Sequence, residues 1–115
     1  MLSQLLIASQ IADFNTDRKR KSFLGALAVR RDGVLVYSRN GSTLNPIGVN
    51  PSMHAEARVL RKAGYGSTIF VSRIRKDSSL GMAKPCTYCM AALKARGVET
   101  VYWTINNDDW DACVP

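Results

Sequence analysis

Hydrophobic positions recur along the first half of the chain with two different periods, and each period predicts a different kind of element. Residues 2–14 carry leucine, isoleucine and alanine on a broad helical stripe. Residues 23–30 and 34–39 are instead rich in β-forming side chains. The Asp32-Gly33 step between them is typical of a hairpin, because glycine tolerates a positive φ. A helix followed by a β-hairpin is therefore expected.

The second half of the chain alternates helices with strands. Residues 54–63 have apolar side chains at helical spacing and precede Gly64, and residues 87–96 follow Pro85 and precede Gly97. The remaining segments are expected to be strands at 67–73 and 100–105, with loops at 41–52 and 77–82. This order predicts an α/β fold, a three-layer α/β/α sandwich with a mixed central sheet. The pattern does not place the last ten residues, where Trp110 could cover either the core or a site.

Length and composition indicate one globular domain spanning residues 1–115. Hydrophobic residues make up 46% of the chain and charged residues 22%, which is ordinary for a soluble protein. The longest nearly apolar stretch, residues 23–29, is far shorter than the ~20 residues that cross a bilayer. The N-terminus has no positively charged leader, and three cysteines cannot all pair within one chain. We therefore expect a cytoplasmic protein without a membrane partner.

Charge is distributed unevenly along the sequence. Residues 1–104 contain all 16 Lys and Arg residues, including an unbroken basic run at 18–21, whereas Asp108, Asp109 and Asp111 crowd the last eleven residues. Such a basic excess attracts phosphate-bearing ligands, either single nucleotides or single-stranded nucleic acid. Solubility alone would explain the same excess.

Three short motifs carry the candidate chemistry. Cys86 and Cys89 are three residues apart at a predicted helix start, so both sulfurs can reach one ion, and Pro85 precedes them. His54, the single histidine of the chain, begins the other helix and supplies an imidazole. Three protein ligands leave a fourth tetrahedral position for water, which is typical of a catalytic zinc site. Glu56 lies two residues beyond His54, where its carboxylate can move protons to and from that water.

Two other interpretations of the same residues remain open. A Cys-x-x-Cys pair at a helix start also occurs as a redox couple, although Pro85 and the distant His-x-Glu favour zinc. A closed structural zinc site would need a fourth strong ligand, and Cys113 would supply it only if the tail folded back.

The His54-Ala55-Glu56 and Pro85-Cys86-Thr87-Tyr88-Cys89 motifs together form the H-x-E…P-C-x-x-C signature of zinc-dependent nucleobase deaminases. On these motifs, and on Phe23-Leu24-Gly25-Ala26 and Asn40, the chain resembles the cytidine deaminase-like superfamily. The resemblance implies a Zn²⁺ cofactor held by His54, Cys86 and Cys89, with Glu56 as the catalytic proton carrier. It further implies four substrate contacts: Leu24 packs on the base, Asn40 meets a sugar hydroxyl, Ala55 offers its N–H to the base, and the Lys84 carbonyl meets the exocyclic amine.

We therefore expect a zinc-dependent hydrolase that deaminates a cytosine-type base to uracil in a free nucleoside or nucleotide. Three alternatives stay open: a cytosine deaminase acting on single-stranded DNA or RNA, an adenine- or guanine-type deaminase, and a non-catalytic zinc-stabilised binding module. The hydrophobic strand at 100–105 looks exposed, which suggests a homo-oligomer by analogy with oligomeric relatives.

Overall fold

The computed structural model describes residues 1–13, 22–39 and 55–115. The described elements follow one another in this order: α1 (Ser3–Asp13), β1 (Ser22–Val29), β2 (Leu35–Arg39), α2 (Ala55–Ala63), β3 (Thr68–Arg75), β4 (Leu80–Gly81), α3 (Thr87–Ala95), β5 (Thr100–Thr104) and β6 (Trp110–Cys113). None of the helices in these ranges is long and apolar enough to cross a membrane.

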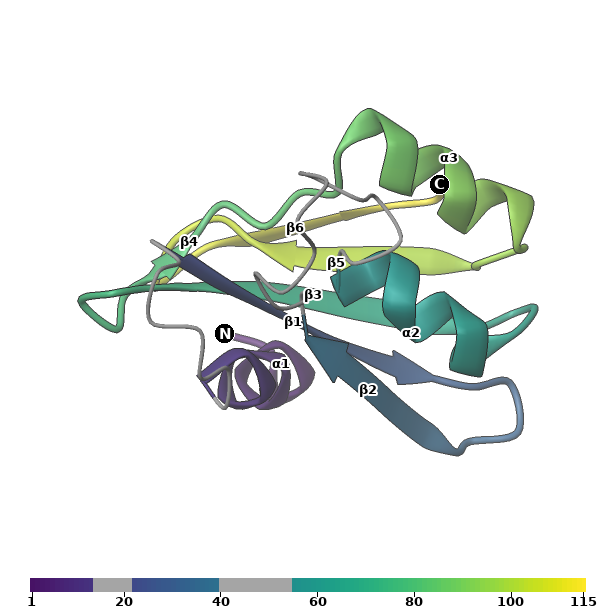
Figure 1. Cartoon of the computed structure of the whole chain (residues 1–115), viewed down its shortest axis with the longest axis horizontal. Coiled ribbons are helices and arrows are strands. Elements are labelled where there is room, and N and C mark those ends of the chain that lie inside the picture. The colour runs from purple at the N-terminus through teal and green to yellow at the C-terminus, as the bar shows by residue number, and fades with distance from the viewer. Residues whose placement is uncertain (14–21, 40–54) are drawn as a thin grey trace, which may run out of the picture.

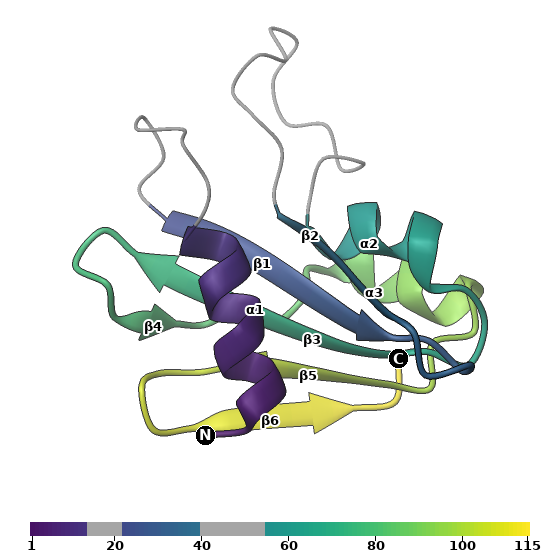
Figure 2. The same cartoon turned by 90° about the horizontal axis from the view of Figure 1, so that it is seen from below.

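The strands form one six-stranded mixed sheet in the order β2-β1-β3-β5-β6, with the short β4 paired to the end of β3. β1 is antiparallel to both β2 and β3, whereas β3 and β5 run parallel. α1 covers one face of the sheet, and α2 and α3 lie together on the other (Figure 1). The view from below shows α1 crossing the sheet opposite to those two helices (Figure 2). The predicted three-layer α/β/α sandwich is confirmed.

The α1 layer rests on the sheet at unusually close range because β1 has a glycine there. A Cβ atom at Gly25 would lie only 2.6 Å from the Ala12 backbone nitrogen and would also overlap the Ala8 carbonyl oxygen. Around this contact, four buried side chains form the core of the layer, namely Leu5, Ala8, Leu27 and Phe70. Gly25 therefore serves the packing of α1.

The opposite face of the sheet carries the larger core. Alternate residues of each strand point to this face, as a period of two requires, and meet the apolar sides of α2 and α3. The buried members include Ala26 and Ala28 from β1, Val59 and Leu60 from α2, Ile69 and Val71 from β3, Leu93 from α3, and Val101 and Trp103 from β5. α2 and α3 are thus fixed against one another and against the sheet.

The elements predicted from periodicity are found with shifts of one or two residues at their ends. Gly33 closes the hairpin with φ of 86°, and its N–H donates to the Arg30 carbonyl at 2.9 Å. Gly64 and Gly97 adopt positive φ directly after α2 and just after α3. The turn residues therefore act as the sequence predicts.

The loop expected at 77–82 contains a short strand, so that expectation is wrong for part of the segment. Its Leu80–Gly81 portion forms β4 and pairs antiparallel with β3, which itself extends to Arg75. Two residues are too few for a detectable period, so pairing with β3 alone defines this strand.

The strand predicted at 100–105 is buried, and the expectation that it is exposed is wrong. β5 lies between β3 and β6, and its Val101, Trp103 and Thr104 side chains are 0–4% exposed. The tail, which the pattern did not place, supplies β6 and so covers the β5 edge. The burial of β5 therefore removes the argument for a homo-oligomer that rested on an exposed strand at 100–105.

Trp110 begins β6, and its ring lies 5.7 Å from that of Tyr102, which stacks on Phe70 in the α1 layer. Trp110 therefore packs on the face of the sheet that carries α1, opposite to α2 and α3. Cys113, at the other end of β6, lies 4.0 Å from the Met90 sulfur on α3.

Candidate metal and substrate site

The topology brings the first turns of α2 and α3 to one end of the sheet. α2 leads into β3 and α3 leads into β5, and these two strands are parallel. Because both helices lie on the same face, each begins near the carboxyl ends of the parallel strands (Figure 1). This is the edge at which ligands bind in open α/β sheets.

The α3 start is shaped by its two cysteines. Cys86 is the N-cap residue, and its sulfur accepts a hydrogen bond from the Cys89 N–H at 3.4 Å. Cys89 is fully buried, whereas Cys86 is exposed. An N-cap position lies at the positive end of the helix dipole, which attracts negative charge. No disulfide joins these cysteines to one another or to Cys113.

This donor pair fits a zinc ion, because thiolates three residues apart are common zinc ligands. The third predicted ligand, His54, lies outside the described residues. Among the side chains that the structure describes, no group of three potential ligands converges. Ala55 and Glu56 form the first turn of α2 by their backbone, immediately after the position of His54.

Cys113 is not in position to complete a closed zinc site. Its sulfur lies 4.0 Å from the Met90 sulfur on α3. The described residues contain no group of three His, Cys, Asp or Glu side chains that could hold one metal ion, so Cys113 does not join Cys86 and Cys89 in such a group. The structural-zinc interpretation therefore lacks its fourth ligand among the described cysteines.

Of the predicted substrate contacts, Leu24 and Lys84 are described and Asn40 is not. Leu24 is partly buried and packs against the core cluster on the α2–α3 face. Lys84 directly precedes Pro85, and its ammonium lies 5.7 Å from the centre of the Trp103 ring. Both residues thus lie on the layer that carries the cysteines.

Arg73, near the end of β3, uses its side chain for a contact within the chain. Its Nε–H donates to the Met82 carbonyl at 2.7 Å, close before the cysteine turn. Thr104, which no sequence signal distinguished from an ordinary strand residue, joins it there through its hydroxyl. The hydrogen bonds of Arg73 and Thr104 join residues that are distant in sequence, so they could not be predicted from the sequence alone.

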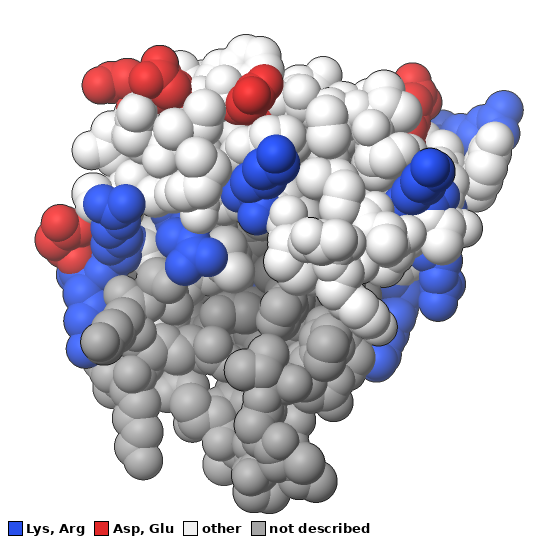
Figure 3. Space-filling view, turned by 90° about the horizontal axis from the view of Figure 1, so that it is seen from above, with Lys and Arg blue, Asp and Glu red and all other residues white. Residues whose placement is uncertain are grey.

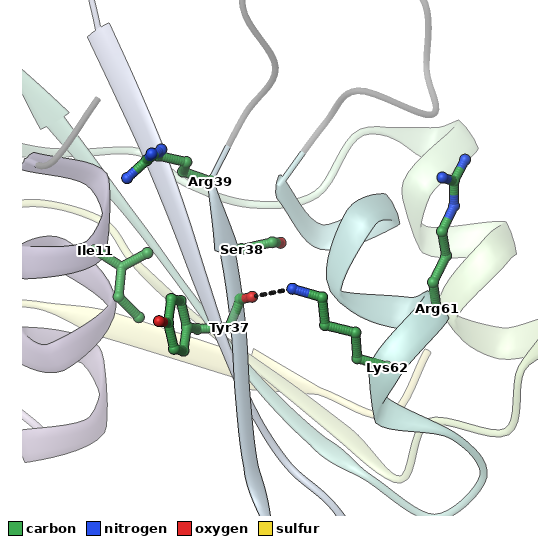
Figure 4. Close-up of a pocket in the computed structure, with 6 residues that line it drawn as sticks. All are labelled: Ile11, Tyr37, Ser38, Arg39, Arg61 and Lys62. Atoms are coloured by element: carbon green, nitrogen blue, oxygen red, sulfur yellow. Dashed lines mark hydrogen bonds between the residues drawn. The ribbon is translucent and has the colours of Figure 1, made fainter. Parts of the chain in front are cut away.

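A separate cavity of about 390 Å³ lies at the β2 edge of the sheet. Its described lining consists of Ile11, Tyr37, Ser38, Arg39, Arg61 and Lys62. Lys62 Nζ donates to the Tyr37 carbonyl at 3.0 Å, and Arg39 and Arg61 point away from one another on either side of β2 (Figure 4). The three cations do not converge, so they do not form a site for a single phosphate.

Figure 3 shows the face that carries α2 and α3. Acidic side chains lie along its upper border and at its left side, and basic side chains lie across its middle and at both sides (Figure 3). In the sequence, Asp108 and Asp109 belong to the β5–β6 turn and Asp111 belongs to β6. Asp77, in the β3–β4 turn, accepts hydrogen bonds from the Ser79 hydroxyl and N–H, and these lower the pKa of its carboxyl.

An α/β sandwich with two helix starts gathered at the carboxyl end of parallel strands defines the class of this molecule. No family model matches the sequence, and no curated protein matches it either. Solved structures do match. The chain is similar to cytidine deaminase from Burkholderia pseudomallei, with 16% identity, a TM-score of 0.66, and 99% of this chain and 93% of that chain covered.

Two further cytidine deaminases show the same likeness. The enzyme from Mycobacterium leprae gives 13% identity and a TM-score of 0.61, covering 96% of this chain and 90% of that chain. The enzyme from Mycobacterium tuberculosis gives 20% identity and a TM-score of 0.57, covering 88% and 80%. The protein therefore has the cytidine deaminase fold, and the resemblance predicted from its motifs is confirmed at the level of the fold.

Proposed function

We propose that this chain is a zinc-dependent hydrolytic deaminase that converts a cytosine-type base to uracil in a free nucleoside or nucleotide. The supporting observation is that Cys86 and Cys89 begin α3 at the same end of the sheet as the first turn of α2, in which Glu56 lies. The fold that carries this arrangement is shared with solved cytidine deaminases.

Zinc would be held by His54, Cys86 and Cys89, and when bound it would supply the Lewis acid that activates water near neutral pH. The position of Cys86 as the N-cap of α3 supports this role, since it places the sulfur three residues before Cys89, within reach of one shared ion. Burial of Cys89 shields its sulfur from competing solvent.

Glu56 would transfer the protons of the reaction. Its carboxylate accepts a proton from the attacking water and gives it to the ring nitrogen beside the amine-bearing carbon, while the water oxygen bonds to that carbon and the ring C=N bond becomes single. The carboxylate then takes the remaining proton from the new hydroxyl and gives it to the amino nitrogen, so that the carbonyl forms, the carbon–nitrogen bond breaks and ammonia leaves. One group acting in both directions requires no other titratable side chain.

Backbone groups and apolar contacts would orient the base. The N–H groups in the first turn of a helix have no intrahelical acceptor, so the N–H of Ala55 would donate to the base. The carbonyl of Lys84 would accept a hydrogen bond from the exocyclic amine, and Leu24 would pack on the ring. Asn40 would contact a sugar hydroxyl.

The test incubates zinc-loaded protein with cytidine, deoxycytidine, their monophosphates, adenosine, guanosine and a single-stranded oligonucleotide, and detects exchange of amine for oxygen by mass spectrometry. We expect turnover of a free cytosine nucleoside or nucleotide. Glu56→Gln should lower turnover by about 10²–10⁴-fold and keep zinc, whereas Cys89→Ser should lose zinc. Cys113→Ser is the matched thiol control and should behave as wild type.

Three results would contradict the proposal. These are a protein without near-stoichiometric zinc, a Glu56→Gln variant with unimpaired turnover, and activity confined to purines or to the oligonucleotide. In the last case binding would also weaken steeply with salt, because many phosphates would be neutralised at once.

A further inference from the structure

We propose that Thr104 and Arg73 are positioning residues that hold residues 81–83 against the strand ends and so set the Lys84 carbonyl and the cysteine turn. The catalytic meaning of this inference rests on the function proposed above. The contacts themselves are a property of the fold.

Thr104, at the end of β5, holds this segment at two residues. Its hydroxyl donates to the Gly81 carbonyl at 2.8 Å and accepts from the Arg73 N–H at 3.3 Å. Its own carbonyl accepts from the Ala83 N–H at 2.9 Å. The Thr104 side chain is fully buried, so water cannot replace the hydroxyl without structural rearrangement.

Arg73 holds the residue between these two. Its guanidinium crosses Gly81 to reach the Met82 carbonyl, and a Cβ at Gly81 would lie 3.2 Å from the Arg73 Cδ and 2.9 Å from the Arg75 Nε. A glycine at this position therefore leaves room for the arginine. Asn107 adds a bond from the preceding Leu80 N–H to its side-chain oxygen at 2.7 Å.

The fixed segment is followed at once by the candidate site. Only Lys84 and Pro85 separate Ala83 from Cys86, and the proline ring locks one of the intervening φ angles. Pro85 is also buried. The hydrogen bonds at residues 81–83 therefore restrict the position of Cys86 through a short, stiff connection. Supporting contacts behind metal ligands commonly act in this way.

The test compares Thr104→Val, which keeps the shape but removes the hydroxyl, with Thr104→Ser, which keeps the hydroxyl. Ser72→Ala is the matched control, because Ser72 is also fully buried and donates to the Leu5 carbonyl on the α1 face. Zinc affinity is measured by competition with a chelator, and the cobalt-substituted proteins are compared by their thiolate-to-cobalt absorption. Thermal unfolding of the metal-free proteins gives the stability of each variant.

We expect Thr104→Val to bind zinc roughly tenfold more weakly and to alter the cobalt spectrum, with Thr104→Ser restoring both. Ser72→Ala should lose stability and keep wild-type zinc affinity. The inference is overturned if Thr104→Val binds zinc as wild type does, or if both variants weaken zinc equally for an equal loss of stability.

Failure of the proposed function gives a different result, in which the wild-type protein binds no zinc at all. Amide hydrogen exchange of residues 81–89 then decides the inference without metal. Faster exchange there in Thr104→Val than in Ser72→Ala supports the positioning role, and equal exchange refutes it.

Discussion

Gly25→Ala should disrupt the seating of α1 on the sheet. The added Cβ would lie 2.6 Å from the Ala12 nitrogen and would overlap the Ala8 carbonyl, whereas ordinary contacts begin near 3.4 Å. Both atoms belong to the helix backbone, so no rotation of a side chain relieves the overlap. The helix must instead move away from β1 by about 1 Å, and a gap of that size forfeits a quarter to a half of each contact energy.

The cost follows from what α1 buries. Leu5, Ala8 and Ala12 are fully buried beneath it, and the Leu5 carbonyl accepts the Ser72 hydroxyl at 2.5 Å. Overpacking of a core costs about 1–3 kcal/mol, and a strained buried hydrogen bond adds about 1 kcal/mol. We expect a loss of about 3 kcal/mol, which for 115 residues lowers Tm by about 12 °C.

Thermal unfolding followed by circular dichroism measures this effect. The control is Gly33→Asn, because a Cβ at Gly33 meets nothing within 4 Å and asparagine tolerates its φ of 86°. It should change Tm by no more than about 4 °C. The double variant Gly25→Ala with Ala12→Gly should not recover, since the overlap is with backbone. A Tm within 4 °C of wild type for Gly25→Ala, or recovery in the double variant, would refute the reasoning.

Two further outcomes follow from exposure and hydrogen bonding at particular groups. In zinc-free protein, iodoacetamide should modify the exposed Cys86 faster than the buried Cys89, as followed by peptide mass spectrometry, and equal rates would contradict the described burial. Ser79→Ala should raise the pKa of Asp77 in an NMR titration, because the Ser79 hydroxyl is the main group that lowers it. Because the pKa of Asp77 is lower in the folded chain than in the unfolded chain, its carboxylate stabilises the native state at pH values above the unfolded pKa. This stabilisation is lost as the pH falls through the folded pKa. An unchanged pKa in the variant would show that the hydroxyl has no such effect.

Local sequence signals predicted most elements, because an element that is buried on one side has apolar residues that recur at regular spacing along its sequence. α1, α2 and α3 carry apolar residues at helical spacing, and Gly33 and Gly64 have the positive φ that their turns need. β6 was missed because it has only four residues, two of them exposed and two partly buried, which are too few to show a clear period of two. Only its register against β5 defines it as a strand.

The sequence predicted the motifs of the candidate site, but it did not predict the hydrogen bonds that hold residues 81–83 before the cysteine turn. The Cys86–Cys89 spacing at a helix start is a local property, and the structure has that helix start. The anchoring of residues 81–83 depends on which hydroxyl of β5 meets which carbonyl of β4, a relation between segments more than twenty residues apart in sequence. Thr104 in a β-rich run predicts only a strand, because threonine is a common strand residue.

β3 connects the two layers through neighbouring residues. Ser72 points to α1 and bonds to Leu5, whereas Arg73 points to the other face and holds Met82 before the cysteine turn. Successive side chains of a strand face opposite ways, so a displacement of α1 that moves Ser72 reaches Arg73 through the β3 backbone. Because that backbone is paired with β1 along all eight of its residues, displacement of α1 should be absorbed mainly as lost stability.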